Sequence, residues 1–192
     1  MNKIVSLTIG FLAVVLSTEV SFAQDYSRHE FRLGWGDPMF EKAVFYESPT
    51  RTEYHYTGHF FLNYNYSFNR WLSAGFNVDF ENVSWKEDSL KKHFSNYTLM
   101  PNVRFTYFRK GLVTMYSGLG IGMTINTGTE ASYTGQKTLC SPAFGLTAYG
   151  ISVGNEHFFG AFDLGALVAL KNTQQIFMFG SRLLSFSIGY RL

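Results

Sequence analysis

The sequence predicts an all-β protein, an eight-stranded antiparallel up-and-down β-barrel that spans a membrane. Aromatic residues make up 18% of the chain although its mean hydropathy is only −0.03, so they must be interspersed with polar residues. Eight segments alternate apolar and polar residues with a period of two, which is the period of a β-strand with two different faces. The connections between them are short at one end and long at the other, as in outer-membrane barrels.

The first residues predict export. "MNKIVSLTIGFLAVVLSTEVSFAQ" has Lys3 near its start, an apolar run over residues 4–16 and a small-x-small cleavage site ending at Ala23. We interpret residues 1–23 as a signal peptide and residues 24–192 as one outer-membrane β-barrel domain. The apolar run is shorter than the roughly 20 residues that a membrane-spanning helix needs.

Composition excludes several classes of protein. The formal net charge is only +2, so the chain lacks the basic field of a nucleic-acid-binding protein, and we expect no nucleic-acid partner. Its single cysteine, Cys140, excludes an internal disulfide framework. No motif in the sequence predicts a cofactor.

The first four predicted strands are residues 29–36, 58–69, 71–81 and 97–108. In "HEFRLGWG", the first of them, Phe31, Leu33 and Trp35 alternate with Glu30 and Arg32. The other three alternate in the same way. Each segment therefore predicts a strand with one apolar face toward lipid and one polar face toward the lumen.

The last four predicted strands are about 112–126, 139–153, 158–170 and 183–192. The fifth contains "YSGLGIGM", in which Gly118, Gly120 and Gly122 occupy one face. A dinucleotide-binding loop would need a glycine where Met123 stands, so the spacing indicates a strand. We expect these glycines to face a narrow lumen.

Two details of packing follow from the same pattern. We expect either Tyr116 or Tyr149 to lie across the space above the glycines. In the sixth strand, Ile151 and Val153 change parity, which predicts a β-bulge at Gly150.

The predicted connections fall into two groups. Tight turns are expected at Asn69-Arg70, Arg109-Lys110-Gly111 and Gly154-Asn155. Long polar loops are expected over residues 37–56, 82–96 and 126–138, and a shorter one around 171–175. This sorting predicts that both chain ends and the tight turns face the periplasm. A soluble sandwich does not require such sorting, and a lipocalin directs its apolar residues inward.

The alternation, the loop sorting and the terminal "SFSIGYRL" resemble those of small OmpA/OmpX-like outer-membrane β-barrel proteins. The stretch "SPAFGLTAYGISVGNEHFFGAFDLGAL" resembles the sixth-to-seventh hairpin of such barrels from Bacteroidota. The resemblance implies a cell outer-membrane location, contact with membrane lipids and lipopolysaccharide, and recognition of the C-terminal strand by the barrel assembly machinery. The chain ends in Leu192, where many such barrels end in Phe or Trp.

Two histidine motifs are candidate sites. His55 and His59 are four residues apart, a distance of about 13 Å along a strand, so one metal ion cannot bridge them. His93 and Ser95 form a His-x-Ser pair, which resembles the pair used by lipid A deacylases, also eight-stranded outer-membrane barrels. No acid partner can be assigned to it from the sequence, and we expect an exposed polar loop end.

Seven charged residues fall on the polar parity of their strands: Glu30, Arg32, Asp79, Glu81, Arg104, Asp163 and Arg191. A charge inside a closed lumen is costly unless it is paired, so we expect ion pairs across the barrel. Buried carboxylates can also serve as acid–base catalysts, but a polar barrel core needs such pairs in any case. For Arg104, the expected partners are Asp79 and Glu81 on the preceding strand.

The predicted loops contain exposed aromatic residues, which either anchor an extracellular partner or rest among lipid headgroups: Phe40, Phe45, Tyr46, Tyr54 and Trp85. From these observations we expect a structural or surface-interaction role such as adhesion, without catalysis. We predict no catalytic, cofactor-binding or metal-binding residue. The alternatives are a lipid-modifying enzyme of the lipid A deacylase kind and a narrow channel or carrier for small apolar molecules.

Overall fold

A computed structural model of the chain describes residues 28–36, 51–87, 90–128, 138–170 and 178–192, so the predicted signal peptide lies outside the described residues. The described residues form nine strands: β1 His29–Gly36, β2 Arg51–Ser67, β3 Leu72–Glu87, β4 Leu90–Lys110, β5 Val113–Gly128, β6 Thr138–Gly154, β7 Phe158–Leu170, β8 Met178–Ser181 and β9 Leu184–Arg191.

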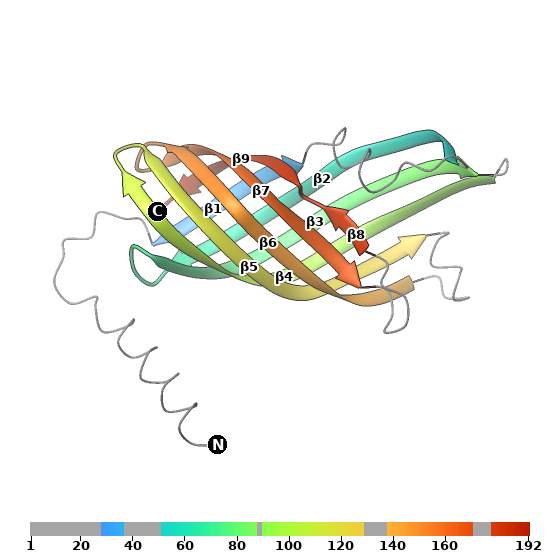
Figure 1. The fold of residues 1–192 in the computed structure, drawn as a ribbon, viewed down its shortest axis with the longest axis horizontal. Coiled ribbons are helices and arrows are strands. Elements are labelled where there is room, and N and C mark those ends of the chain that lie inside the picture. The colour runs from blue at the N-terminus through green and yellow to red at the C-terminus, as the bar shows by residue number, and fades with distance from the viewer. Residues whose placement is uncertain (1–27, 37–50, 88–89, 129–137, 171–177) are drawn as a thin grey trace, which may run out of the picture.

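The nine strands close into an eight-stranded barrel, in which β8 and β9 together take the place of one strand (Figure 1). Consecutive strands from β1 to β7 pair antiparallel, and β9 pairs with both β7 and β1. The short strand β8 pairs with the C-terminal part of β7, and β9 pairs with the preceding part. The two are therefore halves of one barrel strand, which is interrupted at Arg182. The predicted eight-stranded up-and-down barrel is therefore confirmed.

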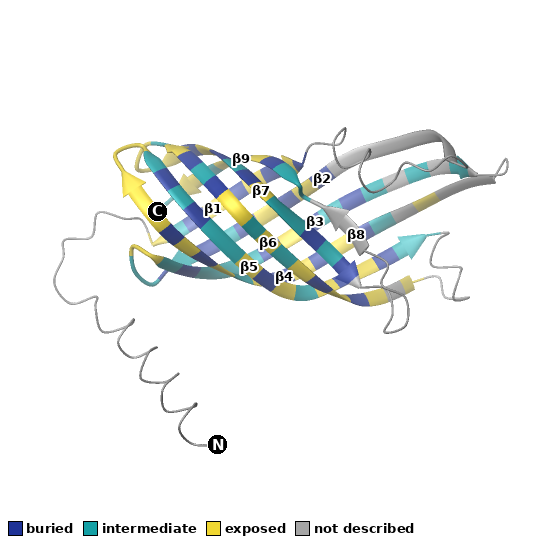
Figure 2. Cartoon of the chain, in the orientation of Figure 1, coloured by how far each residue is buried: buried dark blue, intermediate teal, exposed yellow. Residues whose placement is uncertain are grey.

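Burial follows the alternation of the sequence (Figure 2). In β1, Phe31, Leu33 and Trp35 are exposed whereas Glu30 and Arg32 are buried. An apolar outer face and a polar inner face are the pattern of a barrel in lipid, and they are the reverse of a soluble protein. No helix of the described part of the chain is long and apolar enough to cross a membrane.

Three strands extend further than the sequence predicts. Strand β2 begins at Arg51 instead of residue 58, and the predicted loop over 82–96 is wrong, because β3 continues to Glu87 and β4 begins at Leu90. The pairing runs without interruption to Glu87↔Leu90. The positions of the outward parity in this hairpin are polar, namely Asn82, Ser84, Lys86, His93 and Ser95, so the apolar half of the alternation that marks a membrane strand is missing there.

The short turns lie at the end of the barrel where the described chain begins and ends, as predicted, although all three differ in detail (Figure 1). The β2–β3 turn spans residues 68–71 and is wider than the predicted Asn69-Arg70. The β4–β5 turn is centred on Gly111, whose φ of 55° favours glycine. The β6–β7 turn is longer than a two-residue Gly154-Asn155 hairpin. Asn155 Oδ1 accepts hydrogen bonds from the backbone N–H groups of His157 and Phe158 at 2.9 and 2.6 Å, which caps a wider turn.

The predicted bulge in β6 is present but lies before Gly150. The register between β6 and β7 shifts between Thr147 and Tyr149, and both Ala148 and Tyr149 are exposed. Tyr149 therefore points to lipid, whereas Tyr116 is buried in the lumen, so Tyr116 is the tyrosine of the predicted pair that lies inside.

The glycines of β5 leave room for a methionine. A Cβ added at Gly120 would lie 2.8 Å from Met100 Sδ, and one added at Gly145 would also overlap the end of Met100. Met100 is buried, and its side chain packs against β5 and β6 where Gly120 and Gly145 have no side chains. The prediction of a lumenal glycine face is confirmed, and Met100 is the residue that fills the space beside Gly120.

Candidate functional site

The lumen contains the main cluster of polar side chains. All seven charged residues that the sequence predicts to point inward do so, six of them buried and Arg191 half-buried. Arg182, which the sequence does not identify, joins them from the break between β8 and β9. The described lumen thus holds four arginines and four carboxylates, so its formal charge is balanced.

The cluster nearest the short turns is centred on Glu30. Its carboxylate accepts hydrogen bonds from Arg104 and, at 3.0 Å, from Arg191 Nε. The predicted pairing of Arg104 with Asp79 or Glu81 is wrong. In the register of β3 and β4, Arg104 lies opposite Ser73, while Asp79 lies opposite Thr98, six residues further along the barrel.

The next cluster joins β1, β5 and β7. Arg32 Nη2 lies 2.9 Å from Asp163 Oδ2 and donates a hydrogen bond of 2.6 Å to the Tyr116 hydroxyl. The same hydroxyl donates to Asp163 Oδ1 at 2.5 Å. Tyr116 therefore bridges the two charges, and Ser187 accepts a further hydrogen bond from Arg32 at 2.9 Å. Every member is buried, so this cluster is a closed hydrogen-bonded unit across the lumen.

A third cluster lies toward the opposite end. His59 Nε2 lies 2.8 Å from Asp79 Oδ1, and Arg182 Nη1 lies 3.6 Å from the same oxygen. The Arg182 guanidinium stacks on Phe61 at 4.1 Å from the ring centre. The side chain of His55 lies outside the described residues, and His59 faces the lumen. Among the described residues, no group of three His, Cys, Asp or Glu side chains could hold a metal ion.

Neutral polar side chains extend the hydrogen-bond network of the lumen past the third cluster. Asn96 donates to Glu81 at 2.9 Å and accepts from Asn126 at 2.6 Å, and Thr98 and Thr124 share a hydrogen bond of 2.6 Å. Cross-strand amide and hydroxyl pairs of this kind tie neighbouring strands together, so this part of the lumen is filled by its own side chains.

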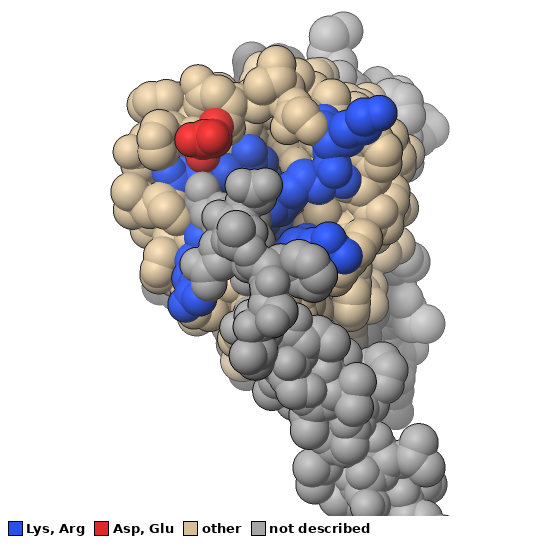
Figure 3. Space-filling model, turned by 90° about the vertical axis from the view of Figure 1, so that its left-hand side faces the viewer, with Lys and Arg blue, Asp and Glu red and all other residues tan. Residues whose placement is uncertain are grey.

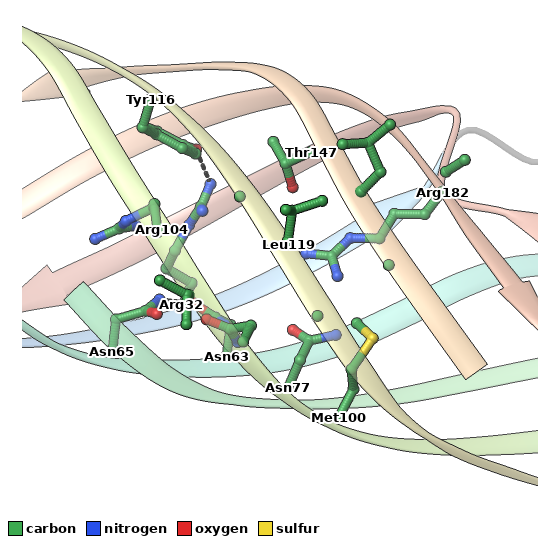
Figure 4. Close-up of a pocket in the computed structure, with 17 residues that line it drawn as sticks. Arg32, Asn63, Asn65, Asn77, Met100, Arg104, Tyr116, Leu119, Thr147 and Arg182 are labelled. Atoms are coloured by element: carbon green, nitrogen blue, oxygen red, sulfur yellow. Dashed lines mark hydrogen bonds between the residues drawn. The ribbon is translucent and has the colours of Figure 1, made fainter. Parts of the chain in front are cut away.

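A small cavity remains between the second and third clusters (Figure 4). Its volume is about 40 Å³, and Asn63, Asn77, Met100 and Arg182 are among the residues that line it. A volume of this size accommodates a few water molecules, whereas pockets for organic ligands usually measure roughly 300–1,000 Å³. Asn77 Oδ1, which accepts no hydrogen bond from the described residues, is a group that such water would satisfy.

The His93–Ser95 pair lies within β4 and not at a loop end as predicted. His93 is exposed, and Ser95 Oγ donates to Asn82 Oδ1 across the β3–β4 hairpin at 3.4 Å. Both residues share the parity of Leu99, whose side chain lies on the outer face. The pair therefore lies on the opposite face of the sheet from the buried lumenal carboxylates. The predicted loop aromatics lie outside the described residues, or, for Tyr54 and Trp85, their side chains do.

A closed barrel with an apolar outer band and a charge-balanced polar lumen is an outer-membrane β-barrel protein of OmpA/OmpX-like architecture. The protein accordingly resides in the cell outer membrane, as the sequence predicts. The sequence matches no family model and no curated protein.

Several solved barrels are similar to this one. The N-terminal β-barrel domain of Pseudomonas aeruginosa OprF is 9% identical with a TM-score of 0.45, over 88% of this chain and 100% of that one. Ail, the attachment invasion locus protein of Yersinia pestis, is 16% identical with a TM-score of 0.45, over 87% and 99% of the two chains. The outer membrane protein OprG from Pseudomonas aeruginosa is 12% identical with a TM-score of 0.47, over 87% and 97%.

The filled lumen predicts that the barrel conducts ions poorly. The clusters around Glu30 and Tyr116 cross the barrel, and ions would have to pass these buried, paired charges. Planar-bilayer recordings of the purified protein should show no steady openings. Large, stable openings would favour the channel or carrier alternative and would contradict the packing described above.

Proposed function

We propose that the protein is a non-catalytic outer-membrane surface protein whose projecting sheet contacts an extracellular partner. The observation that carries this proposal is the extension of β2, β3 and β4 beyond the rest of the barrel (Figure 1). The last pair between β1 and β2 is Trp35↔Phe60, yet β2 continues to Arg51. Those further nine residues, 51–59, cover about 30 Å along the strand.

The extension supports a binding role because, in the part of the chain that the structure describes, it has a strand edge on its β1 side. Within the described residues, no strand pairs with β2 on its β1 side before Phe60 is reached. An unpaired edge presents backbone N–H and C=O groups that can take up an extended segment of a partner. The filled lumen supports the non-catalytic part of the proposal, because its carboxylates already serve as ion-pair and hydrogen-bond partners.

The remaining partners in this proposal are the membrane and its machinery. The outer band supplies the apolar contact for outer-membrane lipids and lipopolysaccharide. Phe186, Ile188, Tyr190 and Leu192 form the exposed face of the last strand, and we infer that the assembly machinery recognises this face. The resemblance of residues 141–167 to barrels from Bacteroidota supports an origin in that group.

Shortening the projecting hairpin tests the proposal. Asn82 pairs directly with Ser95, so replacing residues 83–94 by Asn-Gly joins two paired positions through a two-residue turn. Cells that display the shortened barrel should attach to cultured epithelial cells as poorly as cells that lack the protein. Their resistance to detergent should equal that of wild-type cells. Wild-type attachment by the shortened barrel would contradict a binding role of the projecting sheet.

The lipid-modifying alternative makes a different prediction. If Ser95 were a nucleophile, Ser95→Ala would change the acylation of lipid A, which mass spectrometry of extracted lipid A detects. We expect identical lipid A with the wild-type barrel, with Ser95→Ala and without the protein. Loss of an acyl chain that depends on Ser95 would replace the proposed function with an enzymatic one.

A further inference from the structure

Several exposed charged side chains lie at the end of the barrel with the short turns. Among the described side chains, every exposed Lys, Arg, Asp or Glu lies at the end with the short turns, and these are Arg28, Arg70, Arg109, Lys110 and Glu156. Figure 3 views this end, and Lys and Arg side chains gather over it. Four cations and one carboxylate give this rim a positive balance. The short turns make it the periplasmic end.

Two of these cations lie beside exposed apolar side chains of the outer band. The Arg70 guanidinium stacks on Trp71 at 4.7 Å from the ring centre, and Trp71 is 49% exposed. Lys110 precedes Gly111 and Leu112 in the β4–β5 turn, and Leu112 is 61% exposed. Tryptophan at a membrane boundary lies at the level of the headgroups. Arg70 and Lys110 therefore lie where phospholipid phosphates are found.

We propose that this basic rim binds anionic phospholipid headgroups of the periplasmic leaflet, with Arg70 and Lys110 as the principal contacts. The Arg70 guanidinium offers parallel N–H donors to a phosphate, and the contact with Trp71 holds it in place. Lys110 supplies a second positive charge on another turn. The aromatic and apolar neighbours favour a lipid over a soluble polyanion, because Trp71 fits at the level of the headgroups and Leu112 offers apolar contact to acyl chains.

Competition between two lipids tests this proposal directly. Purified protein in detergent is offered equal amounts of phosphatidylglycerol and phosphatidylcholine, and native mass spectrometry counts the retained lipids. A cation near a charged surface contributes about fivefold in affinity. The wild-type protein should therefore prefer phosphatidylglycerol by more than about tenfold, and Arg70→Gln should reduce that preference about fivefold. The double variant Arg70→Gln/Lys110→Gln should nearly abolish it.

The controls distinguish lipid binding at the rim from a general effect of the protein's charge. Lys86→Gln removes one cation from the opposite end of β3 and should leave the preference unchanged, and Arg70→Lys should retain most of it. Heat-modifiable migration on a gel verifies that each variant is folded. Equal retention of both lipids by the wild-type protein would overturn the proposal, as would an equal effect of Lys86→Gln. Co-sedimentation with purified peptidoglycan without any lipid preference would assign the rim to a cell-wall polyanion instead.

Discussion

Replacing Arg32 with methionine is expected to lower the free energy of unfolding by about 3–5 kcal/mol, because it leaves a buried carboxylate without its cation. Arg32 and Asp163 are each about 3% exposed at their side chains, so bulk water does not solvate the carboxylate that loses its partner. Tyr116 would keep one hydrogen bond to Asp163, but a neutral hydroxyl does not balance the charge. Urea unfolding of the barrel in lipid vesicles measures the difference.

The matched control is the next residue along the same strand. Leu33 is 54% exposed on the outer face, and Leu33→Ile should change the free energy of unfolding by less than about 0.5 kcal/mol. Together, the two variants test the inside and the outside of β1. A larger cost for Leu33→Ile than for Arg32→Met would mean that the parity of this strand is assigned wrongly.

Adding a methyl group at Gly34 is expected to lower the free energy of unfolding nearly as much as losing Arg32. A Cβ at this position would overlap the ring of Phe61, which is only 1% exposed. The ring cannot withdraw easily, because Arg182 stacks on it and His59 packs edge-on against it. Gly34→Ala should therefore lower the free energy of unfolding by about 3 kcal/mol, at the upper end for overpacked cores.

A second substitution and a control identify the cause of that cost. Adding Phe61→Leu to Gly34→Ala should recover part of the lost stability, so that the two changes are not additive. Gly160→Ala is the control, because Gly160 is exposed and an added Cβ there meets no atom within 4 Å. If Gly160→Ala were as costly as Gly34→Ala, the effect would come from the strand backbone and not from contact with Phe61.

The alternation of the sequence predicts the membrane part of this fold well and the projecting part poorly. Apolar residues such as Leu33 face lipid and residues such as Arg32 face the lumen, so a period of two is enough to assign both. The segment over 82–96 has polar residues at its outward positions, and its lysines and serines are typical of a loop although the strands remain paired. The alternation of residues indicates whether each face of a strand contacts lipid or a polar environment, but it does not indicate whether the backbone is paired.

The inward charges could be predicted, but their partners could not. Which residues meet across a barrel depends on the register of every intervening strand, and this is why Arg104 reaches Glu30 from a strand that does not adjoin β1. Met100 follows the inward parity, but its role depends on glycines in two other strands. Arg182 lies at the interruption between β8 and β9, and its φ of 69° is not indicated by any alternation pattern.

The central claim is that the apolar parity faces lipid around a closed polar lumen. A nitroxide scan of β5, with Cys140 first replaced by serine, tests it most directly. In lipid vesicles, labels at Leu119, Ile121, Met123 and Ile125 should be highly accessible to oxygen, whereas labels at Thr124 and Asn126 should not. A period of two in that phase is the predicted result; accessibility without a period of two, or with the opposite phase, would contradict the barrel described here.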